Sequence, residues 1–519
     1  MPVSIRALID RAGREQGFAM VFVLVTLMVA SLLVAAALSA AQQDARLTEN
    51  DLDQKQAYLA AKAGIADYQF FLGQDPNYWT SCPAPTGSIP GDPNATYTVT
   101  PLPATGQSSC NANSPITSMI ESSGPPNGTF RVRSSGFSNG VRRSIVATFQ
   151  NRSFLDYLYY TVYETLSPAA YPSQSDQAAA ATQCNVYWRN GRQPPNVNRN
   201  YCVQIFFATG DAINGPLHTE DELAICGSPV FGRPGHNDAV EVVSPPPGYS
   251  TQGNSGCTNT PTFNTSTGQL MTRAASIQPP PNNAQLKLIA ASNYQWTGQT
   301  DIVLNGGTMT VTNRNLNGGQ PTSMPFPSNG VVFVSSSSCN TVYSPFGLTY
   351  TQFNSNWSYS GSRNCGTLTV HGSYSSSLTM GADNDIVIDG SVTRPNGSSA
   401  LLGLLAQNFV RIYHPCSNGQ NQSGSLANPS IQAAILSLAG SFIVDNYNCG
   451  AQLGSLNVTG AIAQIYRGPV GIIGQDGYLK NYNYDDTLRA EEPPHFLEPV
   501  QAAWHVVRET ECNPGTSVC

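Results

Sequence analysis

Charged side chains are scarce in this chain, and neither sign dominates strongly. Asp, Glu, Lys and Arg together make up 11% of the residues, whereas about 25% is usual in soluble domains. The formal net charge of −7 provides no general attraction for nucleic acid or for anionic lipid. One local group of arginines is expected to be solvated on edge strands rather than to bind DNA: Arg131, Arg133, Arg142, Arg143 and Arg152. The sequence therefore predicts an uncharged polar surface and no nucleic-acid partner.

Motifs for catalysis and metal binding are also missing. The chain contains no C-x-x-C, G-x-S-x-G, H-E-x-x-H, phosphate-loop or calcium-loop pattern, and its 6 histidines are scattered. A glycan-cleaving enzyme would need two clustered carboxyl groups. The candidates are Asp383, Asp385 and Asp389, and Glu220, Asp221 and Glu222 beside His218. Asp385 and Asp389 would share a strand face, but Asp at strand ends usually makes turns. We therefore expect no enzyme activity, no bound metal and no cofactor.

The chain has a single long apolar run, from Phe18 to Ala41. As a helix it would be about 36 Å long, at about 1.5 Å per residue, which is enough to cross a bilayer core of about 30 Å. It is too long for the apolar core of a secretory signal. Arg6, Arg11 and Arg14 precede the run and would keep the N-terminus in the cytoplasm. These features alone also fit an uncleaved membrane anchor.

The helical pattern continues beyond the apolar run. No Pro and no Gly follow Ala41 until Gly64, and apolar residues recur at three- and four-residue steps. The sequence therefore predicts that a membrane-length helix continues directly into an amphipathic one. This helix is expected to break near Gly73 and Pro76.

The leader ending "REQG", the junction Gly17–Phe18, the apolar run and the stretch "AYLAAKAGIADY" resemble the type IV pilin and pseudopilin superfamily, in particular its PilX-like minor members. In that family, a prepilin peptidase on the cytoplasmic face cuts after the Gly and methylates the new N-terminal Phe. The apolar helix then leaves the membrane to form the filament core. The resemblance implies processing at Gly17 and Phe18, with the prepilin peptidase and other pilin subunits as partners.

Two positions depart from the pattern of the family. Phe22 replaces the usual Glu at the fifth mature position, and Lys62 replaces the usual acidic residue of the second motif. In the family, that Glu compensates the positive N-terminal amine among apolar helices, typically that of the neighbouring subunit, and an uncompensated charge there is costly. A subunit without it is expected at the filament tip, as in the tip pseudopilin of type II secretion, rather than as the repeating unit of a shaft.

Twelve cysteines lie outside the apolar run and form neighbours along the chain. The candidate pairs are Cys82/Cys110, Cys184/Cys202, Cys226/Cys257, Cys339/Cys365, Cys416/Cys449 and Cys512/Cys519. Short loops cost the least entropy to close, so local disulfides are favoured, although connectivity does not follow from sequence alone. Disulfides indicate an exported head. The expected location is the bacterial cytoplasmic membrane for the precursor, with the head outside, and then the cell surface or pilus.

The rest of the chain is predicted to be rich in strands. Asn139-Gly140 between two alternating stretches predicts a β-hairpin. Beyond Phe154, similar strands close with Gly372, Gly390 and Gly460, and an irregular spacing of about 20–30 residues favours the coils of a parallel β-helix. A β-sandwich, with a turn about every 8–12 residues, is the alternative. The closing segment, with Pro493-Pro494, is expected to lie along the solenoid and cap its coils.

The expected fold is α+β. It comprises a leader at 1–17, a long helix at 18–73 with its membrane or filament part at 18–41, a loop-rich segment with a small antiparallel sheet at 74–153, and an all-β head at 154–519. The expected function is that of a minor or tip subunit of a type IV pilus-like filament, which acts in initiation, capping and adhesion to a surface or glycan ligand. The alternative is a membrane-anchored extracellular β-helix enzyme that acts on polysaccharide.

Overall fold

A computed structural model describes the chain from residue 6 to residue 513. Outside the description within this range lie residues 76, 122–128, 152, 172, 189–200, 314, 340–363, 473, 490 and 501–503, and the side chains of 6–19, 151 and 174. The chain divides into two compact units. The first comprises Met1–Ile120, Thr129–Gln150 and His505–Cys519, and the second comprises Glu121–Gly128 and Asn151–Trp504. The second unit is called the head below.

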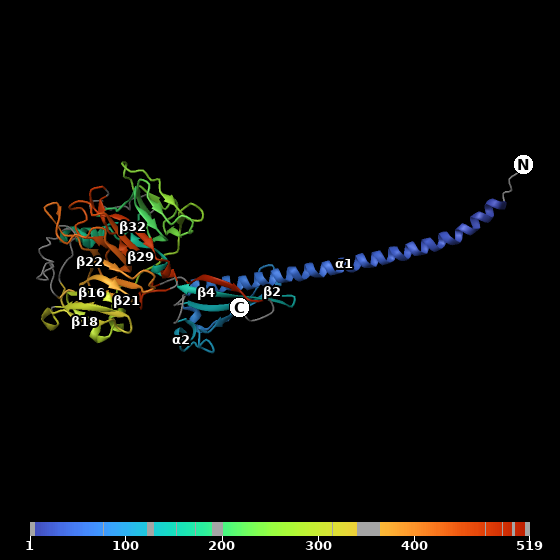
Figure 1. The fold of residues 1–519 in the computed structure, drawn as a ribbon, viewed down its shortest axis with the longest axis horizontal. Coiled ribbons are helices and arrows are strands. Elements are labelled where there is room, and N and C mark those ends of the chain that lie inside the picture. Colours follow the sequence, from blue (N-terminus) through green and yellow to red (C-terminus); the bar gives the residue numbers. More distant parts are fainter. Residues whose placement is uncertain are drawn as a thin grey trace. The chain divides into compact units, whose positions relative to one another are not determined.

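Helix α1 runs without a break over Arg6–Gln74 (Figure 1). The large apolar side chains between Met20 and Leu38 are 50–68% exposed. From Ala57 to Leu72, in contrast, one side of the helix is buried by the first unit. The expected continuous helix and its end near Gly73 are therefore confirmed. The helix ends at Gln74, two residues before Pro76, a residue type that cannot extend it.

The first unit contains a sheet of five strands in the order β1-β2-β3-β4-β33. Its strands are β1 (Thr86–Ile89), β2 (Asp92–Leu102), β3 (Thr129–Ser138), β4 (Val141–Asn151) and β33 (Trp504–Glu511). The pairs from β1 to β4 are antiparallel. Asn139 and Gly140 both have positive φ, 45° and 87°, and form the two-residue turn of the expected hairpin. A short helix, α2 (Pro115–Met119), completes the unit.

Small residues allow α1 to approach the sheet closely. A Cβ added at Gly136 on β3 would lie 2.0 Å from the Ala57 carbonyl oxygen of α1, and one at Gly64 would lie 2.3 Å from the Ser134 hydroxyl. Ala60 and Ala61 are fully buried at the same contact. The alanine-rich stretch after the membrane-length segment is therefore the packing face of α1.

The closing strand β33 lies beside β4 in the small sheet. The expectation that the whole end of the chain belongs to the head is wrong for this strand, since its residues from His505 onward belong to the first unit. Charge pairs favour this placement, because Glu509 binds Lys62 of α1 and Glu511 binds Arg143 of β4. Strands β3 and β4 are interior strands, so the expectation of edge-strand arginines is wrong for those on them.

The head is a large all-β body whose strands stack mainly in parallel. The first ladder contains, in spatial order, β15 (Gln295–Thr297), β19 (Val331–Ser335), β21 (Leu378–Ala382), β23 (Leu402–Ala406), β27 (Ser430–Ser437), β29 (Ser455–Tyr466), β5 (Tyr159–Tyr163), β8 (Leu217–Thr219), β11 (Val240–Val242) and β14 (Met271–Thr272). Every pairing along it is parallel. The α+β class of the chain is thus confirmed.

Two further parallel ladders run beside the first. The second contains β16 (Thr300–Gly306), β20 (Leu368–Tyr374), β22 (Ile386–Thr393), β24 (Val410–Ile412) and β28 (Phe442–Val444). The third leads from β27 and β29 through β32 (Leu479–Tyr484) and β7 (Ala212–Asn214) to β10 (Val230–Phe231) and β13 (Thr262–Phe263).

Shorter elements complete the head. A three-stranded parallel sheet contains β6 (Phe207–Ala208), β9 (Leu223–Cys226) and β12 (Tyr249–Ser250). Antiparallel pairs are formed by β16 with β17 (Thr308–Asn313), β17 with β18 (Thr322–Pro325), β25 (Cys416–Ser417) with β26 (Gln420–Asn421), and β30 (Gly471–Ile472) with β31 (Asp476–Gly477). Two helices, α3 (Gln174–Gln183) and α4 (Ala284–Ile289), accompany these strands.

The spatial order of the strands differs from their order in the sequence. Strand β5, at the start of the head, lies between β29 and β8, in the middle of the first ladder. Along the sequence, the head therefore forms the middle of the first ladder first, at β5, and then extends it to one end at β14. The next strand, β15, lies at the opposite end of the ladder, and the strands that follow occupy the positions from there back to β29. The first and the last strand that the chain contributes to this ladder, β5 and β29, consequently lie side by side.

The core of the head lies between the ladders. At one level of the second ladder, the parallel register aligns Ile302, Val370, Ile388, Ile412 and Val444, which are all fully buried. Each short strand buries its apolar side only when its neighbours stack above and below it. Alternate residues of the same strands, such as Asp301, His371 and Asp389, point away from this core.

Candidate functional site

Part of helix α1 is apolar enough to span a membrane. Among the described residues, one candidate span is found by length and composition, within Met20–Gln74 near the N-terminus. The hydroxyls of Thr26 and Ser31 donate to the carbonyls of Val23 and Met28, at 2.9 and 2.8 Å. Each hydroxyl has its hydrogen bond within the helix, so its transfer into the hydrocarbon core of a membrane costs little free energy.

The expected processing site lies on the backbone of α1. Gly17 and Phe18 lie in the helical backbone of α1, which does not test cleavage or methylation, so both stay predictions. Phe22 is 64% exposed on the apolar surface of the helix. Lys62, the other departure from the pilin pattern, has its carboxylate partner Glu509 on β33.

Five of the neighbouring cysteine pairs are disulfide-bonded in the structure. These are Cys82–Cys110, Cys184–Cys202, Cys226–Cys257, Cys339–Cys365 and Cys416–Cys449. Cys512 is also bonded, whereas Cys519, its expected partner, lies outside the described residues. The apolar helix and the disulfides together fit a membrane-anchored, exported protein.

His218 is the centre of a buried ionic cluster in the head. Parallel register places Tyr160 of β5, His218 of β8 and Glu241 of β11 side by side. The His218 Nδ1 lies 2.8 Å from a Glu241 oxygen, and Nε2 lies 3.1 Å from a Glu220 oxygen. Tyr157 donates to the same Glu241 oxygen at 2.6 Å. All three charged side chains are at most 2% exposed.

In this cluster the His218 ring lies between two carboxylates, one at each ring nitrogen. An ionised carboxylate only accepts hydrogen bonds, so two carboxylates beside the two ring nitrogens favour the imidazolium form of His218, in which both nitrogens donate. Burial by itself lowers the pKa of His218, but the hydrogen bonds and charges of Glu220 and Glu241 outweigh it and raise the pKa. Glu241 is the member that sequence reasoning missed, because it is adjacent to His218 only through the strand register.

The neighbouring acids have separate structural roles. Asp221 accepts from the backbone N–H groups of Trp188 and Glu222, at 2.6 and 2.9 Å. Burial raises its pKa well above the usual range. Glu222 accepts from the Ser250 hydroxyl at 2.5 Å. Of the candidate group in the sequence, the structure therefore joins only His218 and Glu220, whereas Asp221 and Glu222 bind other groups.

Two of the three candidate aspartates, Asp383 and Asp385, lie in the connection between β21 and β22 and have structural partners. Asp383 accepts from the backbone N–H of Ser336 at 2.8 Å. The fully buried Asp385 accepts from the N–H of Phe409 at 3.1 Å and lies 3.5 Å from the Arg411 guanidinium. Burial raises the pKa of Asp385 to about 8. These contacts give Asp383 and Asp385 structural roles. Asp389 is the candidate carboxylate that is less buried.

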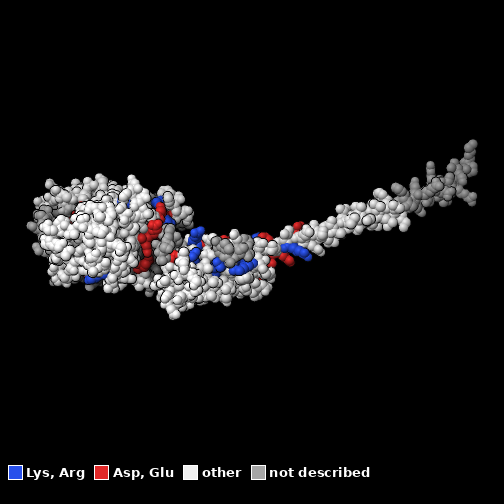
Figure 2. Space-filling view, turned by 60° about the horizontal axis from the view of Figure 1, so that its bottom comes forward, with Lys and Arg blue, Asp and Glu red and all other residues white. Residues whose placement is uncertain are grey.

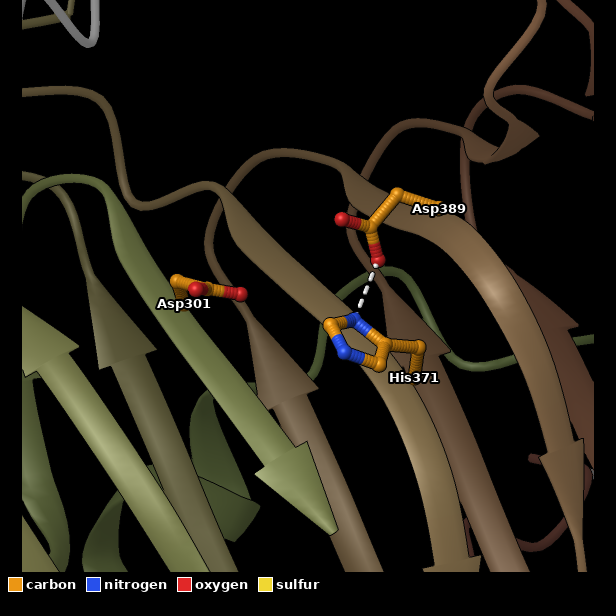
Figure 3. A group of neighbouring side chains, drawn as sticks. All are labelled: Asp301, His371 and Asp389. Carbon is orange, nitrogen blue, oxygen red and sulfur yellow. Dashed lines mark hydrogen bonds and ion pairs between the residues drawn. The ribbon is translucent and has the colours of Figure 1, made fainter. Parts of the chain in front are cut away.

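Asp389 belongs to a half-buried group with His371 and Asp301 (Figure 3). The three residues lie on β22, β20 and β16, which are neighbouring strands of the second ladder. Asp389 lies 2.9 Å from the His371 Nδ1. Its hydrogen bond raises the pKa of His371, against the effect of burial. Burial and the nearby Asp389 charge raise the pKa of Asp301 to about 6.

The sequence held a partial signal for this group. "VHGS" and "IDGS" place His371 and Asp389 directly before Gly372 and Gly390, at equivalent positions of two similar strands. Stacked coils bring such equivalent positions together. Asp301 had no such signal, because it lies two residues before Val303, the register partner of His371.

Comparisons with known proteins do not assign the chain to a family. No protein-family model and no curated protein sequence matches the chain. A solved structure, the crystal structure of the competence-associated pilin ComZ from Thermus thermophilus, matches over 88% of this chain and 97% of its own. The TM-score is 0.31 and the sequence identity is 11%, which is too low for an inference about fold or function.

Proposed function

We propose that the chain is a minor pilin-like subunit of a type IV pilus-like filament, located at the tip or involved in initiation. The observation that carries the proposal is helix α1, Arg6–Gln74. One uninterrupted helix presents a bare apolar surface from Met20 to Leu38 and packs one side of its stretch from Ala57 to Leu72 on a small sheet. A plain membrane anchor has no need for such a continuation. A subunit whose helix enters a filament core needs both parts.

Phe22 favours the tip over the shaft. The positive N-terminal amine of a processed subunit lies among apolar helices, where an uncompensated charge is expensive. Phe22 cannot compensate it, and among the described residues Met20 to Ala41 of α1 no acidic side chain takes over this role. The subunit is therefore suited to a position at which no equivalent subunit depends on its helix for charge compensation.

The head supports a role in contact with a surface. We infer that its parallel ladders form a β-helix, because every pairing in the first ladder is parallel, whereas β-sandwiches are built from antiparallel sheets. Most of the surface visible in Figure 2 carries neither Lys or Arg nor Asp or Glu. A long, sparsely charged solenoid presents a broad surface for a glycan or host ligand.

We also propose that the head is not an enzyme. Glu220, Asp221, Glu222 and Asp385 are bound in buried structural contacts. The alternative, a polysaccharide-cleaving enzyme, would depend on the less buried Asp389. Release of reducing ends from a panel of polysaccharides, lost in Asp389→Asn, would support the alternative over the filament subunit.

The N-terminal residue of the mature protein tests the proposal directly. Mass spectrometry should find Phe18 at the N-terminus, methylated, and Gly17→Leu should leave uncleaved precursor in the membrane. Gly73→Ala is a matched control, since an added Cβ at Gly73 meets nothing within 4 Å. An intact Met1 end in assembled filaments would contradict the proposal.

Location in the filament is tested by immunogold labelling against the head. We expect gold at filament ends for the natural sequence. The variant Phe22→Glu restores the compensating charge and should allow labelling along the shaft. Dense labelling of the shaft without this substitution would identify a major pilin and refute the tip assignment.

A further inference from the structure

Three side chains from neighbouring strands converge on the outer side of the second ladder. Val303 of β16 pairs with His371 of β20, and Asp301, two residues earlier, lies on the same face as Val303. Asp389 of β22 reaches the His371 Nδ1 from the other side, at 2.9 Å. The residues in between, such as Ile302, point into the core. The cluster therefore faces away from the core.

The distances within the cluster match one metal ion. One ring nitrogen and one oxygen from each carboxylate all lie within 4.8 Å of one another. Bonds of about 2.0–2.2 Å to a common ion hold two ligand atoms at most about 4.4 Å apart. Small side-chain rotations would therefore bring all three atoms into one coordination sphere.

One oxygen of the Asp301 carboxylate lacks a hydrogen-bond partner among the described residues. This atom, Oδ1, is buried. The second carboxylate, Asp389, carries charge of the same sign within the same cluster. A buried, unpaired acceptor costs free energy. A cation placed between Asp301, His371 and Asp389 would remove that cost.

We propose that Asp301, His371 and Asp389 form a binding site for a divalent transition-metal ion of the Zn²⁺ type. Zinc accepts imidazole nitrogen and carboxylate oxygen together, and three protein ligands leave a fourth position open. Calcium prefers six to eight oxygen ligands and magnesium an oxygen octahedron, so neither suits a ring nitrogen. The ion joins three neighbouring strands of the ladder, and the strand register holds its ligands in place before it binds.

This site departs from the sequence-based expectation of no metal, and it is independent of the proposed filament role. The sequence shows no metal motif because the ligands are far apart along the chain, at 301, 371 and 389. Stacking of the coils alone brings them together. An ion at this site would fasten the coils of the head, whichever position the subunit takes in a filament.

The test uses the full-length chain in detergent, stripped of metal with a chelator and titrated with Zn²⁺, Mn²⁺ and Ca²⁺ separately. Bound metal is measured by calorimetry and elemental analysis, and melting is followed by circular dichroism. We expect binding of Zn²⁺ that raises the melting temperature, with weaker binding of Mn²⁺ and none of Ca²⁺. Asp301→Asn, His371→Gln and Asp389→Asn should each weaken Zn²⁺ binding by about 100-fold or more, beyond the effect usual for an outer-shell change.

Controls separate loss of the site from loss of the fold. His236→Gln removes an exposed histidine elsewhere in the head and should bind Zn²⁺ as before. Asp301→Asn preserves the shape of the side chain, so its metal-free melting curve reports whether the head is folded. Unchanged Zn²⁺ binding in a folded Asp301→Asn protein would overturn the proposal. Absence of Zn²⁺ binding, or Ca²⁺ binding of equal strength, would overturn it as well.

Discussion

His218 and His371 each lie between acidic side chains on parallel strands of the same head, but their surroundings differ. The His218 side chain is fully buried, and both of its ring nitrogens contact a carboxylate. The His371 side chain is 37% exposed, has one carboxylate at hydrogen-bond distance, and lies beside an Asp301 oxygen without a described partner. In the first cluster each ring nitrogen has a carboxylate partner, so we expect this cluster to stabilise the fold. The second is left incomplete in the way that ligand sites are.

Removal of the His218 ring should have the largest effect. His218→Ala leaves Glu220 and Glu241 buried without their cation, and breaking a buried ion pair costs about 3–5 kcal/mol. We expect a large drop in the denaturant midpoint of the head, followed by fluorescence. His236→Gln is the matched control and should change stability by about 0.5 kcal/mol at most, as surface substitutions do. A midpoint unchanged in His218→Ala would show that the ion pair does not support the fold.

The second-largest effect should be a dependence of the free energy of unfolding on pH, caused by the His218 cluster. The pKa of His218 is raised in the folded state, so its contribution is fully present below the unfolded pKa of about 6.5 and is lost as pH rises through the folded value. Each unit of difference corresponds to about 1.4 kcal/mol. Unfolding free energies measured from pH 6 upward should fall in the natural chain. His218→Gln should lack this component, and an identical pH profile in both proteins would refute it.

Asp301→Asn should have the opposite sign. The pKa of Asp301 is raised to about 6, so its charged form, which dominates above that pH, opposes folding. Without metal, the substitution should therefore stabilise the head at pH 7, by about 1 kcal/mol after allowance for partial solvent screening. Thermal melting in the presence of a chelator measures this gain. With Zn²⁺ present, the natural chain should instead be the more stable one.

A destabilised Asp301→Asn protein in chelator would remove the contrast between the two clusters. It would show that Asp301 supports the fold and is not held in an unfavourable environment for the sake of a ligand.

His371→Gln should have the smallest effect on the metal-free protein. Its bond with Asp389 is partly exposed to water, and such pairs contribute about 0–1 kcal/mol. Chemical unfolding in chelator should therefore give nearly the same midpoint as the natural chain. A loss as large as that of His218→Ala would place both histidines in the same structural role.

Local features of the fold could be predicted from the sequence, because local residues decide them. The long helix predicted over 18–73 follows from apolar periodicity and the absence of Pro, although the observed helix begins earlier, at Arg6. The hairpin at Asn139-Gly140 follows from two residues that tolerate positive φ. The class of the head follows from short alternating strands. Each of these signals lies within a few residues of the structure it specifies.

Contacts between distant segments were decided only by the tertiary structure. The pairing of Lys62 with Glu509, the place of β33 in the small sheet, and the position of β5 between β29 and β8 all join segments hundreds of residues apart. A strand carries its alternation but not the identity of its neighbour, since any strand with a matching apolar face can pair with it. Glu241 reached His218, and Asp301 reached His371, through that choice of neighbour and register. The sequence alone determined the helix and the kind of head, and the stacking of the coils decided which side chains meet.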